Sequence, residues 1–369
     1  MKVLYLTPWY PSKKDEMSGL FVRKHVEAVR AQGVEVRVIF AESWRETVRQ
    51  WKALRREGWI PDVVQLNVIQ KQGLLALWLK KRYGIPYVIV EHWSGYLPEN
   101  GMFKRLSAIK KRIYRRIAAQ AEQVLCVSQR LQQAMQDCGI RAQQWGLIDN
   151  VVDGFFFEKV ESKKTEVESR KTKVESKKTK VESKKTLLHV SCFDERAKNV
   201  KGLLRAAKML SEKRQDWKLV LVGTGVDYTD VRAFADTLDI PEGLLEWTGE
   251  LTPSEVAERM HEADALVLSS RYETYGVVLA EAAAAGLPIL STPVGIAENV
   301  ANLIVPQEIA QNKPGRMAEF METILWGQEV RVKSQKLKVE SKKSEERFSA
   351  DFIGKKLKKS YDSCLHRDI

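Results

Sequence analysis

The chain has 369 residues, of which 44% are apolar, and this length and composition predict a globular protein with two domains of ordinary size. Its apolar runs are far shorter than the ~20 residues that a membrane-spanning helix needs, and its first residues lack a signal-peptide core. Four cysteines without metal or disulfide spacing indicate a reducing, cytoplasmic location, and we expect Cys126 and Cys192 to be buried thiols.

The net charge of +13 comes mostly from two repetitive segments, which argues against a nucleic-acid-binding surface. Residues 159–186 are four near-copies of Lys-Val-Glu-Ser-Lys-Lys-Thr with a charge of +6, and residues 331–347 repeat the unit with a charge of +4, which leaves +3 for the rest. One apolar residue in seven is too few for a coiled-coil seam. We therefore predict solvated, disordered or frayed insertions, with a basic tether to anionic lipid or acidic polymer as the alternative.

The first half of the chain alternates strand and helix signals. A helix is predicted at 20–32, ending at Gly33, and buried strands are predicted at 3–7, 34–40, 63–66, 87–90 and 124–127. Between the last two strands, apolar residues recur at helical spacing over 102–117 among seven basic residues, and 100–121 contain no acidic side chain. Such a helix can either lie on an anionic membrane surface or pack on the sheet with a wet basic face.

The second half restarts the same alternation after the first repeats. Strands are predicted at 187–190, 219–222, 265–268 and 288–291, with a helix at 200–210 and another that begins with a capping box at Thr252. The tail, 348–365, reads as a helix. Two βα-alternating halves joined near residue 155 favour an α/β protein with two Rossmann-like domains that face each other across a cleft.

The most informative stretch is 267–295, where a strand runs into a polar loop, a helix that opens at about Gly276, and another strand. Ligands of parallel α/β proteins bind at the carboxyl ends of strands, and amides near Tyr275, Gly276 and Val277 can hold a phosphate. Glu273 and Glu281 stand eight residues apart around this helix start. The stretch resembles the donor-binding segment of retaining glycosyltransferases of family four, which have the GT-B fold and a Glu-x7-Glu motif; the alternative is an Ala-rich helix with two solvated glutamates.

The resemblance covers nearly the whole chain outside the repeats. Its other signatures lie at 8–19, 91–95, 148–153, 198–199 and 223–225. It implies an acceptor-side domain at 1–155, a repeat insertion at 156–186, a nucleotide-sugar-binding domain at 187–330, a second insertion at 331–347, and a helix at 348–369 that returns to the first domain.

The same resemblance implies roles for charged residues of the second half. Lys198 looks like the lysine that binds the donor diphosphate, where a fixed cation stabilises the leaving group. Cys192 stands where the family often has an arginine, and Arg196 could supply that charge from a shifted position. Glu281 would hydrogen-bond the ribose, and Glu273 would lie beside the transferred sugar. For Arg196 and Lys198 the alternative is a solvated helix start.

In the first half, the resemblance implies that His92 touches the donor sugar; a core or capping histidine is the alternative. Gly19 resembles the glycine that lets the first loop approach phosphate or acceptor, although Ser18 replaces a second glycine. Gly223 would form a tight turn with Gly225 after a strand.

No metal-ligand spacing is present, so cationic side chains and helix amides would do the work of a divalent metal. The sequence thus predicts a cytoplasmic, retaining, metal-independent glycosyltransferase without cofactor. Its expected partners are a nucleoside diphosphate sugar, a glycan or lipid-linked acceptor and an anionic membrane surface, with a role in surface polysaccharide synthesis. The rivals are a non-catalytic scaffold with this fold and a nicotinamide dehydrogenase, whose Gly-x-Gly-x-x-Gly loop is missing from 8–19.

Overall fold

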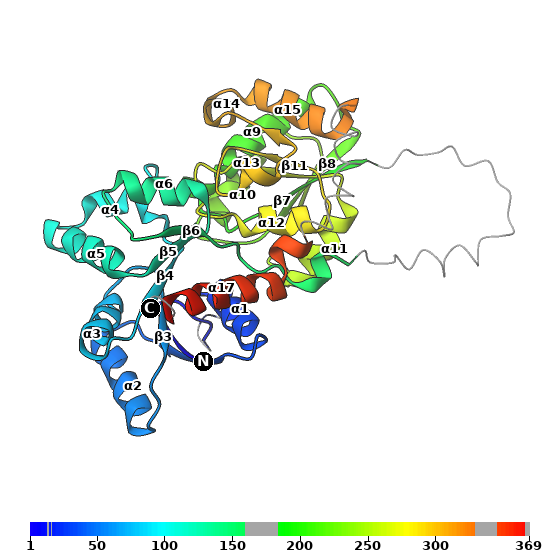
Figure 1. Ribbon diagram of the computed structural model, residues 1–369. Helices are drawn as coiled ribbons and strands as arrows, with labels where there is room; N and C mark the ends of the chain where they lie inside the picture. Colours follow the sequence, from blue (N-terminus) through cyan, green and yellow to red (C-terminus); the bar gives the residue numbers. More distant parts are fainter. Residues whose placement is uncertain (13–14, 16, 159–183, 329–344, 366–369) are drawn as a thin grey trace, which may run out of the picture. The chain divides into compact units, whose positions relative to one another are not determined.

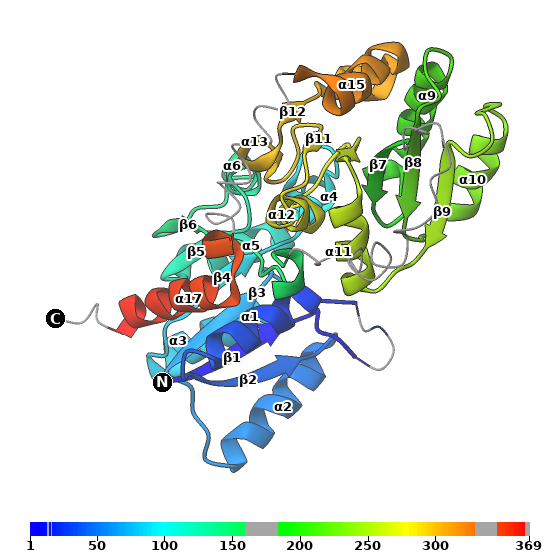
Figure 2. The same ribbon diagram turned by 90° about the vertical axis from the view of Figure 1, so that its right-hand side faces the viewer.

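The computed structural model describes residues 1–365 except 13–14, 16, 159–183 and 329–344. Most of the two predicted repeat insertions therefore lies outside the described residues. The chain forms two compact units (Figures 1 and 2). The first unit comprises 1–152, 272–276 and 346–369, and the second comprises 153–271 and 277–345.

The first unit is built on a six-stranded parallel sheet in the order β2-β1-β3-β4-β5-β6. Its strands are β1 (Lys2–Thr7), β2 (Glu35–Phe40), β3 (Val63–Asn67), β4 (Tyr87–Glu91), β5 (Gln123–Cys126) and β6 (Trp145–Leu147). Its helices are α1 (Leu20–Arg30), α2 (Trp44–Arg56), α3 (Gly73–Tyr83), η1 (Ser94–Tyr96), α4 (Met102–Arg105), α5 (Ala108–Gln120), α6 (Gln129–Asp137) and α17 (Ala350–Leu365). Because β3 and β4 lie in the middle of this sheet, they are buried at every position.

The last described helix, α17, packs on α1 and on the first sheet. Its buried residues recur at helical spacing, and they are Ile353, Gly354, Leu357, Tyr361 and Cys364. Gly354 allows close approach, since a side chain there would collide with the Ala28 carbonyl of α1. The Tyr361 hydroxyl lies 2.9 Å from that of Tyr5 and donates to Gln65. The end of the described chain is thus part of the core of the unit that contains its beginning (Figure 2).

The second unit has a parallel sheet in the order β12-β11-β10-β7-β8-β9. Its strands are β7 (Lys185–Val190), β8 (Trp217–Val222), β9 (Leu245–Gly249), β10 (Ala265–Leu268), β11 (Ile289–Ser291) and β12 (Leu303–Ile304). Its helices are η2 (Gly154–Phe156), α8 (Glu195–Lys198), α9 (Val200–Ser211), α10 (Tyr228–Asp236), α11 (Pro253–Glu262), α12 (Val277–Ala284), α13 (Ala297–Val300), α14 (Gln307–Asn312) and α15 (Pro314–Trp326). Trp217, Leu219 and Leu221 of β8 point into a core that α9 and α15 cover.

The predicted α/β class with two Rossmann-like sheets is confirmed. The capping box of α11 at Thr252 is also present. The single helix predicted at 102–117 is wrong in detail, because Leu106 is extended and Ser107 caps a new helix by accepting from the Lys110 amide. Cys126 is buried as expected, but Cys192 is exposed in the loop after β7. None of the helices in the described part of the chain is long and apolar enough to cross a membrane.

Candidate functional site

The second sheet changes its direction of growth between β7 and β10. From β7 the chain adds β8 and β9 on one side, and β10 then returns to the other side of β7. In open parallel sheets, ligands bind outside the carboxyl ends of the strands at such a switch point. The segments that follow β7, β8 and β10 carry seven of the predicted site residues, which are Arg196, Lys198, Gly223, Glu273, Tyr275, Gly276 and Val277.

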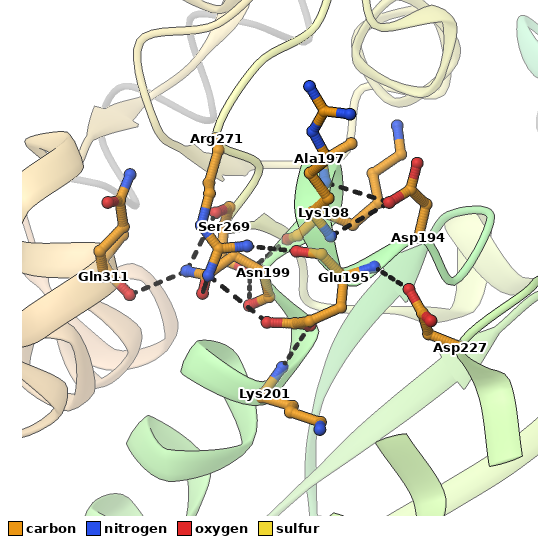
Figure 3. A network of polar contacts seen from close by, with 12 residues as sticks. Asp194, Glu195, Ala197, Lys198, Asn199, Lys201, Asp227, Ser269, Arg271 and Gln311 are labelled. Atoms are coloured by element: carbon orange, nitrogen blue, oxygen red, sulfur yellow. Dashed lines mark hydrogen bonds and ion pairs between the residues drawn. The ribbon is translucent and has the colours of Figure 1, made fainter. Parts of the chain in front are cut away.

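Lys198 is the last residue of α8, a single helical turn after β7. Asp194 begins this turn and accepts from the amides of Arg196 and Ala197, at 3.1 and 3.4 Å. The amide of Glu195 donates to Asp227 at 2.8 Å, and the Lys198 amide donates to the Asp194 carbonyl at 2.8 Å (Figure 3). Lys198 is half-buried whereas Arg196 is exposed, so the turn presents two cations in different surroundings.

Arg271, which the sequence analysis did not single out, holds α8 from the side of β10 (Figure 3). Its amide donates to the Ala197 carbonyl at 2.7 Å, and its guanidinium donates to the Glu195 carbonyl and, at 2.8 Å, to Asn199 Oδ1. Ser269 adds bonds from its hydroxyl to the carbonyls of Lys198 and Asn199, at 3.1 and 3.0 Å. No local pattern marks these residues, because their partners come from a distant strand end.

Gly223 follows β8 with φ +121°, and a side chain there would collide with the Ser191 carbonyl. The loops after β7 and β8 can therefore touch only because this residue is glycine. A side chain at Gly225 would likewise collide with the backbone of Phe193. Instead of the predicted tight turn, residues 223–225 form an irregular loop, and the turn follows them, where the Tyr228 amide donates to the Gly225 carbonyl at 3.2 Å.

The segment 272–276 joins β10 to α12 and is grouped with the first unit, where two contacts hold it. The Ser128 hydroxyl donates to the Thr274 carbonyl, and the buried Tyr275 donates its hydroxyl to Asp149 at 3.2 Å. Arg347 binds both oxygens of Asp149, at 2.9 and 3.1 Å. Tyr275 therefore anchors the segment that carries the half-buried Glu273. Glu281 is half-buried on α12 in the second unit.

His92 follows β4 in the first unit and is buried next to Phe21 and His25. Burial, together with the neighbouring His25, keeps its pKa well below the ordinary value, so the ring is neutral near pH 7. Its Nε2 has no hydrogen-bond partner among the described residues. A buried polar atom without a partner is costly and indicates a position that a ligand can satisfy.

Glu91, directly before His92, is fully buried and accepts from three backbone amides. These amides belong to Ile69, His92 and Trp93, at 3.0, 3.0 and 2.9 Å. The Glu91 side chain thus fixes the backbone conformation at His92. A charged residue inside an otherwise apolar strand was the signal that could have marked it from the sequence.

Gly19 precedes α1 with φ +67°, and a side chain there would collide with the Trp9 carbonyl. The glycine is therefore required by the packing of its own loop, whatever binds there. The two units hold the candidates in separate groups: His92, Gly19, Glu273, Tyr275 and Gly276 in the first, and Arg196, Lys198, Gly223, Val277 and Glu281 in the second. No cluster of potential metal ligands occurs in the described ranges.

Two family models match successive parts of the chain. "Glycosyltransferase Family 4" matches residues 2–154, and "Glycosyl transferases group 1" matches residues 170–338. A solved structure of HepE from Anabaena with UDP and glucose superposes with a TM-score of 0.70 at 16% identity, covering 98% of this chain and 100% of that one. The lipopolysaccharide outer core galactosyltransferase WaaB gives a TM-score of 0.65 at 16% identity, with 98% and 99% covered.

Curated relatives match parts of the chain. The alpha-monoglucosyldiacylglycerol synthase of Streptococcus pneumoniae is 26% identical over 62% of this chain and 52% of its own length. The N-acetyl-alpha-D-glucosaminyl L-malate synthase of Bacillus anthracis is 32% identical over 37% of this chain and 32% of its own. The matches thus span about half or less of these relatives. The two parallel sheets and the solved structures that superpose on them define an α/β protein with the GT-B fold. The chain belongs to the glycosyl transferases of group 1, with the GT-B fold.

Proposed function

We propose that this chain is a retaining glycosyltransferase that moves a sugar from a nucleoside diphosphate to a glycan or lipid-linked acceptor in surface polysaccharide synthesis. The observation that supports the proposal is the switch point of the second sheet, where the segments after three adjacent strands carry Lys198, Gly223 and the start of α12. The named similar proteins support sugar transfer, since they include an alpha-monoglucosyldiacylglycerol synthase and the lipopolysaccharide outer core galactosyltransferase WaaB.

In this proposal Lys198 and the amides at 276–277 bind the donor diphosphate, and Arg196 adds a second cation. Fixed charges and amides stabilise the negative charge that develops on the leaving diphosphate. Glu281 accepts hydrogen bonds from the ribose hydroxyls. Glu273 and the neutral His92 contact the donor sugar, where the unsatisfied Nε2 of His92 would gain a partner. The leaving phosphate takes the acceptor proton during front-face attack, so neither a nucleophile nor a metal ion is required.

Nucleotide binding is the direct test. Thermal shift with UDP, GDP and ADP should reveal one stabilising nucleotide, because a ligand at 100 times its Kd adds roughly 2.7 kcal/mol. Glu281→Ala should weaken that nucleotide by about 1.5–3 kcal/mol, the value of a hydrogen bond to a charged group. The matched control is Glu298→Ala, an exposed glutamate on α13. Equal calorimetric affinity of the two variants would remove Glu281 from the site.

Turnover tests the chemistry. With the matching nucleotide sugar, NMR of the product should show the same anomeric configuration as the donor, and a chelator should leave the rate unchanged. An inverted product contradicts the retaining mechanism, and a rate that needs added metal contradicts metal independence. A chain that binds nucleotide but transfers nothing to a range of glycan and lipid acceptors would favour the non-catalytic scaffold.

We also propose that the chain docks peripherally on the inner face of an anionic membrane through α4 and α5. Their outward side combines exposed cations with Ile109 and Met102, which are 74% and 45% exposed. Trp78 is 45% exposed on α3, which packs against α5 (Figure 1). Exposed apolar and aromatic side chains among cations suit the boundary between headgroups and acyl chains.

The structure sharpens the variant for this test. Arg115 donates to the Cys138 carbonyl and Lys111 to the Lys104 carbonyl, so both support the fold and stay unchanged. Lys110, Arg112 and Arg116 are exposed and become glutamine. Each cation near an anionic surface contributes about 1 kcal/mol, so co-sedimentation with phosphatidylserine-containing vesicles should fall strongly.

The control removes the same charge from α17 through glutamine at Lys355, Lys356 and Lys359. All chains in this comparison have 159–183 replaced by a neutral linker, so that the lysines of this segment do not contribute. Zwitterionic vesicles and raised salt, which screens charge, give the baseline. Equal sedimentation of the two variants, or none at low salt, would show that the basic face is only a solvated surface.

A further inference from the structure

Arg271 holds the helical turn that carries Lys198. It comes two residues before Glu273 in the chain, and its side chain reaches α8, which ends at Lys198 (Figure 3). Its side chain is about one-third exposed, and the guanidinium uses separate nitrogens for the Glu195 carbonyl and for Asn199. A planar guanidinium with several donors in a fixed geometry can hold two acceptors at once, which a lysine cannot.

The turn that Arg271 holds has little stability of its own. α8 contains four residues, and a single turn is unfavourable in isolation. It ends at Asn199, a non-glycine residue with φ +53°, whose side-chain amide is fixed by the carbonyls of Ala310 and Ser269, at 3.0 and 3.4 Å. Arg271 binds the oxygen of that same amide and the first carbonyl of the turn. It therefore ties both ends of α8 to the loop after β10.

The carboxylate of Glu195 completes this arrangement. It accepts from the Lys201 amide at 3.0 Å and lies 3.5 Å from the Arg271 guanidinium. The backbone and side chain of Glu195 thus both face Arg271. The Arg271 guanidinium is therefore occupied by hydrogen bonds and an ion pair within the protein. An arginine that served only as a phosphate ligand would direct its N–H donors at the ligand.

We propose that Arg271 is a positioning residue: by holding α8 it sets the place of Lys198, and donor binding depends on Arg271 through Lys198. This inference rests on the proposed function, which assigns the donor diphosphate to Lys198. It predicts that the two residues behave as one unit: once Lys198 is gone, loss of Arg271 has little further effect on nucleotide affinity.

The test measures calorimetric affinity for UDP, GDP and ADP with wild type, Lys198→Gln, Arg271→Gln, Arg271→Lys and the Arg271→Gln/Lys198→Gln double variant. Arg271→Gln should lower the affinity for the nucleotide that wild type binds by about tenfold or more, the factor for one charge-assisted hydrogen bond. Arg271→Lys should restore only part of it, since it keeps charge without the fork. The double variant should match Lys198→Gln.

The matched control is Lys201→Gln, which removes a neighbouring cation whose side chain pairs with exposed Asp230 at 2.6 Å. It should leave affinity unchanged. Amide exchange over 195–199 in the absence of nucleotide should rise in Arg271→Gln and not in Lys201→Gln, and a second readout, circular dichroism, verifies that each variant is folded.

The outcomes separate the two hypotheses. Wild type that binds none of the nucleotides overturns the proposed function. Wild type that binds, with Lys198→Gln impaired and Arg271→Gln unimpaired, overturns the positioning role alone. Additive losses in the double variant also overturn it, because they mean that Arg271 acts independently of Lys198. If amide exchange over 195–199 is faster in Arg271→Gln but its nucleotide affinity is unchanged, the Arg271 contacts are purely structural. This outcome also overturns the positioning role.

Discussion

At the scale of single residues, Glu91 is a carboxylate enclosed in the first sheet. Burial raises its pKa to about 7 from 4.5, although the amides of Trp93, Ile69 and His92 oppose the shift. Between these two pH values the folded state keeps a proton that the unfolded state has lost. The stability contributed by this residue therefore falls as pH rises through that window and is constant above it.

We expect the free energy of unfolding of wild type, relative to Glu91→Gln, to decrease by up to roughly 3 kcal/mol between pH 4.5 and 7. Urea denaturation at a series of pH values measures this difference. His25 is the matched control with the opposite sign, since burial lowers its pKa to about 4 from 6.5. The free energy of unfolding of wild type, relative to His25→Gln, should increase as pH rises from about 4 to 6.5. If the differences in unfolding free energy do not change with pH for either variant, the shifted pKa values of Glu91 and His25 are contradicted.

At the scale of elements, the segment 272–276 depends on contacts distant in sequence. Tyr275→Phe removes only the hydroxyl that binds Asp149. We expect a loss of about 1 kcal/mol in stability and faster amide exchange within 272–276, with a lower turnover because Glu273 is less well held. Tyr361→Phe removes a buried hydroxyl from α17 in the same unit and serves as control. If both variants exchange alike over 272–276, the Asp149 contact does not anchor the segment.

The same scale shows which elements could be predicted. Strands such as β4 are short apolar runs with a clear start and end, and their predicted positions agree with the structure within a residue or two. The break between α4 and α5 was missed because the apolar spacing continues through it, while one hydroxyl, that of Ser107, decides the backbone. β12 has two residues, too few for any periodicity. Long-range hydrogen bonds such as that of Arg271 leave no periodic trace.

At the scale of the whole molecule, the structure supplies the order of the strands in each sheet, which the sequence does not predict. Alternation of strands and helices predicts parallel sheets, but it does not say which strands are neighbours. The pairing of β7 with both β8 and β10 places the predicted loops at one switch point. The donor-binding roles of Lys198, Glu273 and Glu281 are predictions from the sequence, and nucleotide-binding experiments test them.

The repeat segment provides the last prediction. Residues 159–183 lie outside the described residues, and the structure shows that β7 begins at Lys185. A deletion through 186, as the repeat pattern suggests, would therefore remove two residues of that strand. Replacing only 159–183 by a short Gly-Ser linker removes no residue of a described element. Each doubling of loop length changes the free energy of loop closure by only about 0.6 kcal/mol. We therefore expect the melting temperature and the nucleotide affinity to stay close to those of wild type.

The control for this replacement is the longer deletion of 159–186, which should lower the melting temperature, since Lys185 and Thr186 pair with Trp217 and Lys218 of β8 and the Lys185 ammonium pairs with Asp264 at 2.6 Å. Turnover with a soluble acceptor should also survive the 159–183 replacement. A folded linker variant that binds nucleotide normally but transfers no sugar would show that the repeats take part in acceptor binding or catalysis. Loss of transfer only when the acceptor is presented in anionic vesicles would instead support the basic tether, because nine cations among 159–183 outnumber five glutamates.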